Sequence, residues 1–197
     1  MIPSKRLPLI LAISLLLIIG IAITFSLIPQ EKEQQQRPQN IRNGTTILSF
    51  IPDSSTTSPL KKTQGDKVNL DLMVNPGTDA ITFIKFQLTY DPNVLELDKA
   101  NPFTVESTTF SGFTDGPLLE TGQLSQSVSI GFDPTKAITQ PTKVGILHFK
   151  IRNDAKANST TIRFTDQTQI LSAGSDAAAA QNVLSQTKPA VINIDSR

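Results

Sequence analysis

The side chains that could carry out chemistry are few and scattered along the chain. The 197-residue sequence has one histidine, His148, and neither cysteine nor tryptophan. Without cysteine there can be no disulfide, thiolate metal site, iron–sulfur cluster or cysteine nucleophile, and a single histidine cannot form a multi-histidine metal centre. No serine and acid can be assigned to a triad with His148. We therefore interpret His148 as an ordinary outward-facing residue of a strand.

The carboxylates are also unpromising as catalytic or metal-binding groups. Aspartate and glutamate occur singly, so that neither a calcium-binding loop nor a glycosidase pair can be recognised from spacing. Asp91 is followed directly by Pro92, a context that favours turn capping over acid catalysis or calcium binding. The sequence predicts no enzyme, no catalytic residue, no resident metal and no cofactor. A net charge of +1 gives no electrostatic reason to bind nucleic acid.

The N-terminal segment has the properties of a membrane anchor. Leu7–Ile28 carries no charge and is dominated by leucine and isoleucine. As a helix it would be about 33 Å long, enough to cross a hydrocarbon core of about 30 Å. Lys5 and Arg6 precede it, which places residues 1–6 in the cytoplasm and everything after the helix outside the cell. We predict a single-pass protein held in the lipid bilayer of the cell membrane by residues 7–28.

A cleaved signal peptide is the alternative for this segment. The apolar run is longer than the core of a signal peptide, roughly 7–15 residues, and no small-x-small cleavage site follows it. The uncleaved anchor is therefore preferred, although the remainder of the chain is exported under both interpretations. Residues 29–44, rich in glutamine and charge, are predicted to form a flexible linker.

Residues 45–195 alternate between apolar and polar types as strands do. This period of two recurs in five segments and is typical of sheets with one buried face. The residues expected to face inward are Val68, Leu70, Leu72, Val74, Ile84, Phe86, Leu88, Tyr90, Val128, Ile130, Phe132, Leu147, Phe149, Ile151, Ile162 and Phe164. Turn-forming residues, including Asp115-Gly116-Pro117, punctuate the segments. We predict an all-β fold, an antiparallel β-sandwich or jelly roll of about nine strands.

One corner has a distinctive local sequence, FQLTYDPNVLEL, at Phe86–Leu97. Tyr90 is expected to end a strand with its ring at the margin of the core. Asp91 can cap the backbone amides that follow, and Pro92 fixes the φ angle of the turn. The hydrophobic residues after the turn then fold back onto the edge of the sandwich.

This corner resembles the Tyr-Asp-Pro corner of the bacterial cohesin domain. Four further segments resemble that family in the same order along the chain: Ile47–Pro52, Gly65–Pro76, Gly145–Ile151 and Gln181–Ile194. The ordered set is more specific than the corner alone, because related carbohydrate-binding sandwiches share the corner.

The resemblance implies a non-catalytic module that binds dockerins, small helical modules that carry their own calcium. In cohesins the partner binds the flatter sheet, which includes the strand before the Tyr-Asp-Pro corner. The corresponding residues here are Phe83, Lys85, Gln87, Ser127, Ser129 and Arg163. Members of the family often carry asparagine and aspartate where this chain has Phe83 and Lys85. We expect Phe83 to act as an apolar anchor, and Lys85 and Arg163 to favour an acidic partner.

Two other functions remain open. The sandwich could bind polysaccharide directly, because fold does not determine function. Such sites usually present tryptophan or tyrosine rings to sugars, whereas this chain has no tryptophan and its one tyrosine lies in the corner. The domain could also be a passive part of an envelope assembly that contacts another surface protein or only copies of itself.

Overall fold

The computed structural model describes residues 41–112, 114–131, 133–172 and 180–195. The predicted cytoplasmic tail, the membrane helix and most of the linker lie outside these residues. Within the described ranges, no helix is both long enough and apolar enough to cross a membrane.

The described residues form strands and a single 3-10 turn, η2 (Pro134–Lys136). There are thirteen strands in these ranges, of which nine have six or more residues. The number of longer strands equals the predicted number, but one of them, residues 114–120, was interpreted as a turn region, and the four short strands were not predicted. The strands are β1 (Ile41–Ile51), β2 (Leu60–Thr63), β3 (Lys67–Asn75), β4 (Ile81–Thr89), β5 (Leu95–Leu97), β6 (Phe103–Val105), β7 (Thr114–Glu120), β8 (Gln123–Ser129), β9 (Thr142–Ile151), β10 (Ser159–Phe164), β11 (Gln169–Ser172), β12 (Gln181–Thr187) and β13 (Ala190–Asp195).

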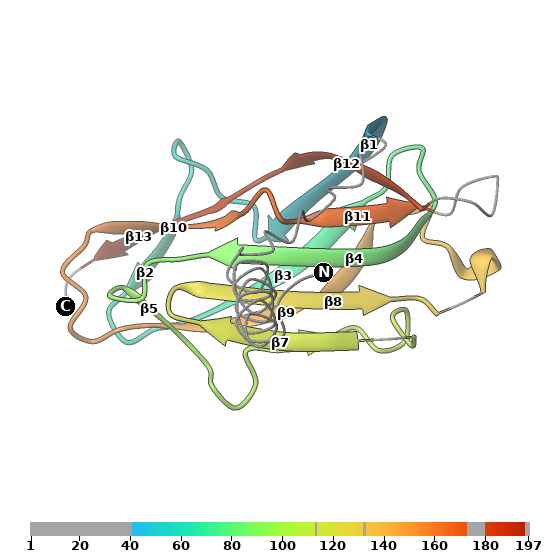
Figure 1. The fold of residues 1–197 in the computed structure, drawn as a ribbon. Coiled ribbons are helices and arrows are strands. Elements are labelled where there is room, and N and C mark those ends of the chain that lie inside the picture. Colours follow the sequence, from blue (N-terminus) through green and yellow to red (C-terminus); the bar gives the residue numbers. More distant parts are fainter. Residues whose placement is uncertain (1–40, 113, 132, 173–179, 196–197) are drawn as a thin grey trace, which may run out of the picture. The chain divides into compact units, whose positions relative to one another are not determined.

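The strands are arranged in two layers. In Figure 1, β11, β4, β8 and β7 lie side by side in front, and β3 and β9 lie behind them. Backbone pairing continues from one layer to the other through β12 and β1, so that the sheet rolls over on itself. A branch of β10, β13 and β2 extends the sheet beyond one end of β4.

Two strand pairs differ from the predicted antiparallel arrangement. β1 pairs with β12 in parallel, and β13 pairs with β2 in parallel. Each pair joins segments that are far apart in the sequence, and a parallel pair needs such a long connection instead of a hairpin. The other pairings between strands are antiparallel, and the fold is therefore a mixed β-sandwich.

The core confirms most of the predicted inward positions. All of the predicted residues on β3, and Ile84, Phe86 and Leu88 on β4, are fully buried. Phe132 lies outside the described residues. Tyr90 and Phe164 are only partly buried, but both pack on rings of neighbouring strands. Phe164 stacks on Phe50 at a centroid distance of 4.8 Å, and Tyr90 meets Phe149 edge-on at 5.2 Å.

The first strand begins inside the predicted linker, at Ile41. Gly44 is the reason that the backbones can pair so closely there, since a Cβ atom at this position would lie 1.9 Å from the carbonyl oxygen of Val183 in β12. The buried carboxylate of Asp79 then secures the strand to the β3–β4 loop. It accepts hydrogen bonds from the Thr45 backbone amide at 2.8 Å and from the Thr46 hydroxyl at 3.0 Å.

The Tyr-Asp-Pro corner is built as predicted. The Asp91 carboxylate accepts a hydrogen bond from the backbone amide of Asn93 at 2.9 Å, which caps the turn. Val94 and Leu95 follow the turn and are buried. The Tyr90 amide donates to the carbonyl of Gly122 at 2.9 Å, and Gly122 has a φ of 75°, a backbone conformation that favours glycine. The corner is thereby joined to the β7–β8 hairpin.

Candidate recognition face

The candidate site is the outward side of the front layer, and β4 is its central strand. β8 pairs with one edge of β4, and β11 with part of the other. Because Ile84, Phe86 and Leu88 point into the core, the alternate residues Phe83, Lys85 and Gln87 must point outward. We call this outward side of β7, β8, β4 and β11, together with the end of β10, the recognition face.

Strand register arranges the recognition face in rows, because directly paired residues share a side of the sheet. In the first row, Phe83 lies between Ser129 of β8 and Leu171 of β11. Leu171 is partly exposed. The first row therefore presents two apolar side chains at one end of the face.

The second row centres on Lys85. Its neighbours are Ser127 of β8 and Gln169 of β11, and Asp115 of β7 lies on the far side of Ser127. Ser127 is only 9% exposed, and it contributes far less surface than its predicted role requires.

The third row contains a residue that sequence reasoning missed. Gln87 pairs with Ser125, and Ser125 pairs with Leu118 of the edge strand β7. Leu118 is 63% exposed, more than any other large hydrophobic residue in the part of the chain that the structure describes. The small serine between them leaves Leu118 standing above the surrounding surface.

The fourth row places Arg163 at the end of the face away from Phe83. Arg163 of β10 pairs with Thr89, which pairs with Gln123, which in turn pairs with Glu120 of β7. The Gln87 amide donates to the Gln123 side-chain oxygen at 3.1 Å and links the third and fourth rows. The structure therefore brings the six predicted residues onto one face, with Arg163 at its far end.

The sequence misplaced β7 because Asp115-Gly116-Pro117 was interpreted as a turn. These residues lie within β7, where the register shifts between Asp115 and Leu118. Such a bulge breaks the alternation of the sequence. The adjacent leucines after it therefore gave no periodic signal, although an exposed apolar pair could have been suspected.

The charges of the recognition face are separated. Lys85 and Arg163 lie on β4 and β10, whereas Asp115 and Glu120 lie on the edge strand β7. Among the described residues, neither cation takes part in a salt bridge. A partner would therefore meet a basic group at the middle of the face, a second at its far end, and acidic groups along the β7 edge.

The recognition face is hollowed at the Phe83 end, whereas the resemblance to cohesins implied binding on the flatter sheet. A depression of about 730 Å³ is lined by Phe83, Ser129, Ile130 and neighbouring loop residues, among them Asp133 and Lys136. Hydrogen bonds from the side chain and the backbone of Thr135 lower the pKa of Asp133, so that its carboxylate remains charged at neutral pH.

Burial affects the ionisation of the corner tyrosine. Desolvation raises the pKa of Tyr90 above its usual value of 10.0, and a hydrogen bond with the backbone of Gly122 acts in the opposite direction. Tyr90 is therefore neutral at physiological pH. The structural role predicted for Tyr90, Asp91 and Pro92 stays a prediction.

His148 lies in the other layer, on β9. Its two ring nitrogens lie 3.1 Å from the Asn69 side-chain oxygen and 2.9 Å from the Thr104 hydroxyl. In the described part of the chain, no cluster of three or more histidine, aspartate or glutamate side chains is placed to hold a metal ion.

Comparison with known protein families identifies the family to which this chain belongs. The family model of the cohesin domain matches residues 53–188. The chain belongs to the cohesin family. The match covers strands β2 to β12 in full, and hence every strand of the recognition face of this cohesin.

Solved structures with the same fold include cohesins from bacteria and from an archaeon. The seventh ScaB type I cohesin from Pseudobacteroides cellulosolvens has a TM-score of 0.60 and 14% identity, over 77% of this chain and 93% of that chain. A type I cohesin–dockerin complex from Clostridium thermocellum has a TM-score of 0.60 and 13% identity, over 78% and 96%.

A non-cellulosomal cohesin from the hyperthermophilic archaeon Archaeoglobus fulgidus has a TM-score of 0.54 and 18% identity, over 77% of this chain and 91% of that chain. No curated protein matches the sequence.

Proposed function

We propose that this cohesin is a non-catalytic recognition module that docks a dockerin-type protein on its recognition face. The observation that carries the proposal is the arrangement of Phe83, Leu171 and Leu118 as partly exposed apolar groups among small and polar side chains. Protein interfaces commonly depend on a few such anchors surrounded by contacts of little energetic weight. Several structures of similar fold are cohesin–dockerin complexes.

The proposed mechanism is complementarity with a rigid surface. Paired strands hold the side chains of the recognition face at fixed intervals, so that little conformational entropy is lost on binding. Lys85 and Arg163 would attract acidic groups of the partner, and the acidic edge formed by Asp115 and Glu120 would favour basic ones. Any calcium would be carried by the dockerin, and no step requires a metal in this chain.

We further propose that the domain works at the outside of the cell membrane. Residues 7–28 would anchor the chain in the bilayer, and the linker would hold the sandwich away from it. The support for this location is the sequence alone: an uncharged apolar segment preceded by two basic residues, Lys5 and Arg6.

The test is binding of the full-length chain, kept soluble in detergent, to purified dockerin modules of the same organism. Calorimetric titration should give saturable binding in calcium that is lost with a chelator, because the partner's fold needs the ion. A Phe83→Ala, Leu118→Ala double variant should bind at least about 100-fold more weakly, as expected for loss of two anchors. Equal binding by the double variant, or no binding to any such dockerin, would refute the proposal.

Direct polysaccharide binding by the recognition face is less favoured. Phe83 is the one aromatic side chain in the rows described above, and a planar strip for stacking on sugar rings needs several. Retention of the chain on insoluble glycans, with loss of retention in Phe83→Ala, would support this alternative.

A further inference from the structure

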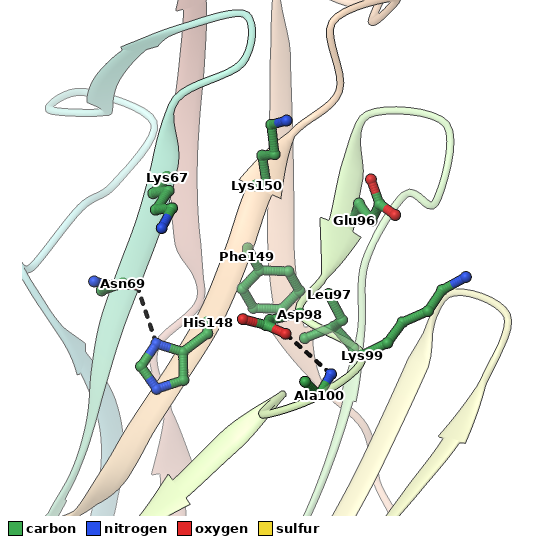
Figure 2. A pocket seen from close by; sticks show the side chains of 10 residues that line it. All are labelled: Lys67, Asn69, Glu96, Leu97, Asp98, Lys99, Ala100, His148, Phe149 and Lys150. Carbon is green, nitrogen blue, oxygen red and sulfur yellow. Dashed lines mark hydrogen bonds between the residues drawn. The ribbon is translucent and has the colours of Figure 1, made fainter.

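The layer opposite the recognition face carries a second concave site. A hollow of about 540 Å³ lies on the outward side of β3, β9 and β5 (Figure 2). This volume falls within the range of roughly 300–1,000 Å³ found for small-molecule sites. The polar residues that line it are Lys67, Asn69, Glu96, Asp98, Lys99, His148 and Lys150.

One wall of the hollow is fixed by a chain of hydrogen bonds. The Asn101 amide donates to the Thr104 hydroxyl at 2.9 Å, and that hydroxyl lies 2.9 Å from Nε2 of His148. The Thr104 proton can then be donated to Nε2, while Nδ1–H donates to the Asn69 oxygen, 3.1 Å away. Both ring nitrogens of His148 are thus within hydrogen-bond distance of a partner, and these contacts hold the imidazole in place as part of the wall.

Donors and acceptors face each other across the hollow. Lys67 and Lys150 are directly opposite in the β3–β9 register, and Glu96 pairs with the other side of Lys150. Figure 2 shows the Lys67 ammonium group turned toward Asn69 and His148, whereas the ammonium groups of Lys99 and Lys150 point away. The cationic donor of the hollow is therefore Lys67, on the β3 side.

The acceptor on the other side is Asp98, which follows β5. Its Oδ1 accepts hydrogen bonds from the backbone amides of Ala100 at 3.0 Å and Asn101 at 3.3 Å, which fixes the carboxylate in place. Among the described residues, no hydrogen bond engages its Oδ2. The carboxylate projects from the β5 side into the hollow in Figure 2. Leu97 and Phe149 also border the hollow, but both are buried in the core.

This arrangement suits hydroxyl groups better than it suits an ion. A hydroxyl can donate to the Asp98 carboxylate and accept from the Lys67 ammonium group. A charged ligand would meet both signs of charge, and exposed ion pairs contribute little affinity. A ligand with several hydroxyls on a rigid ring could contact both walls at once.

We propose that the hollow binds one unit of a neutral polysaccharide through its hydroxyl groups. Such a site depends on hydrogen bonds and needs no exposed aromatic platform, in agreement with a chain that has no tryptophan. It lies in the layer opposite the recognition face, so that a protein partner and a glycan could be held together. The inference does not rest on the proposed docking function.

The test is a titration of the isotopically labelled full-length chain in detergent, followed by nuclear magnetic resonance. The probes are neutral β-linked hexasaccharides of glucose, of xylose and of N-acetylglucosamine. With at least one of them, the amide signals of Asn69, Asp98 and His148 should shift saturably, and those of Phe83 and Lys85 should not.

Two conservative variants examine the walls separately. Asp98→Asn retains the Oδ1 acceptor that holds the turn. Lys67→Gln removes the charge and retains most of the aliphatic part of the side chain. Each variant should weaken sugar binding at least about fivefold. Lys85→Gln on the recognition face is the matched control and should leave sugar binding unchanged. The proposal is overturned if none of the hexasaccharides shifts these signals, if the shifts occur on the recognition face, or if both wall variants bind as well as the unmodified chain. Tighter binding of hexagalacturonate than of every neutral probe would overturn the assignment to a neutral sugar.

Discussion

Gln87 and Leu118 lie in one row of the recognition face, on opposite sides of Ser125. One residue belongs to the central strand and the other to the edge strand, and the small serine between them leaves a step at the leucine. The most exposed apolar group of the face is therefore positioned by a strand that the sequence pattern did not reveal.

Leu118 should be an energetic anchor for the protein partner. Truncation in Leu118→Ala removes apolar surface that only a partner can bury, so that we expect affinity for a cognate dockerin to fall about 10-fold or more. Thermal unfolding should be nearly unchanged, because the side chain is mostly exposed. Ile51→Ala is the control, since Ile51 is 50% exposed on β1 and lies outside the recognition face. An affinity equal to that of the unmodified chain would remove Leu118 from the interface.

Reversal of the two basic charges should weaken docking through electrostatics. Lys85→Glu with Arg163→Glu replaces attraction for acidic groups by repulsion, and we expect a loss of at least about 10-fold, mainly in the association rate at low salt. Surface plasmon resonance at two ionic strengths measures the affinity, the association rate and their dependence on salt. Lys150→Glu, in the opposite layer, should have no effect. If the double reversal strengthens binding, the partner surface is basic rather than acidic.

Gln126 should be a stabilising position for an apolar residue. Its side chain is 3% exposed, and its Oε1 has no hydrogen-bond partner among the described residues. Its amide nitrogen makes one long bond, 3.3 Å, to the Ser127 carbonyl. Gln126→Met keeps the length and removes the unsatisfied oxygen, and we expect the free energy of unfolding to rise by about 1 kcal/mol.

Denaturant titration measures this change, with Gln167→Met at an exposed position as the control. A decrease in stability would mean that the hydrogen bond of the Gln126 amide contributes more free energy than the burial of its polar atoms costs.

Alkaline pH should unfold the domain partly through Tyr90. Burial raises the pKa of this phenol above its usual value of 10.0, so the folded state holds the proton more tightly than the unfolded chain. The corresponding stability is fully present below pH 10 and is lost as pH rises through the folded-state pKa. Tyr90→Phe cannot ionise and should lose less stability between pH 9 and about pH 11.

Tyr90 is the only tyrosine in the sequence. The absorbance of tyrosinate therefore reports its titration directly in the folded chain. A midpoint at or below 10.0 would contradict the predicted direction.

Gly44 should be intolerant of any side chain. A Cβ atom would lie 1.9 Å from the Val183 carbonyl oxygen, and β1 and β12 would have to separate. Gly44→Ala should lower the free energy of unfolding by about 3 kcal/mol, at the upper end of overpacking effects. Ser185→Ala, at an exposed position of β12, serves as the control in the same denaturation experiment. A loss below about 0.5 kcal/mol, typical of surface substitutions, would show that the strands can shift without cost.

The longer strands could be predicted because one face of each is buried. Val68, Leu70 and Leu72 alternate with polar residues, and each is fully buried in β3. The parallel pairing of β1 with β12 could not be predicted, since alternation reports which side of a strand is buried and not which strand lies beside it. The Tyr-Asp-Pro corner was predictable because its turn chemistry is local.

The candidate site was predictable only in part. Phe83, Lys85 and Gln87 follow directly from the alternation of β4. The low exposure of Ser127 could not be predicted. Ser127 lies between Lys85 and Asp115 in its row, and the sequence does not show which strands lie on either side of it. The exposure of Leu118 could not be predicted, because it follows a bulge in β7 where the three residues that resembled a turn continue the strand.

The bulge has an evolutionary consequence. Deletion of one residue from the edge strand would bring Leu119 to the place of Leu118 and turn every later side chain of β7 over. The central strands and the core would be untouched, because β7 pairs with β8 alone. Gain or loss of a single codon in the edge strand could thus change which partner the protein binds. The variants along the way would remain folded.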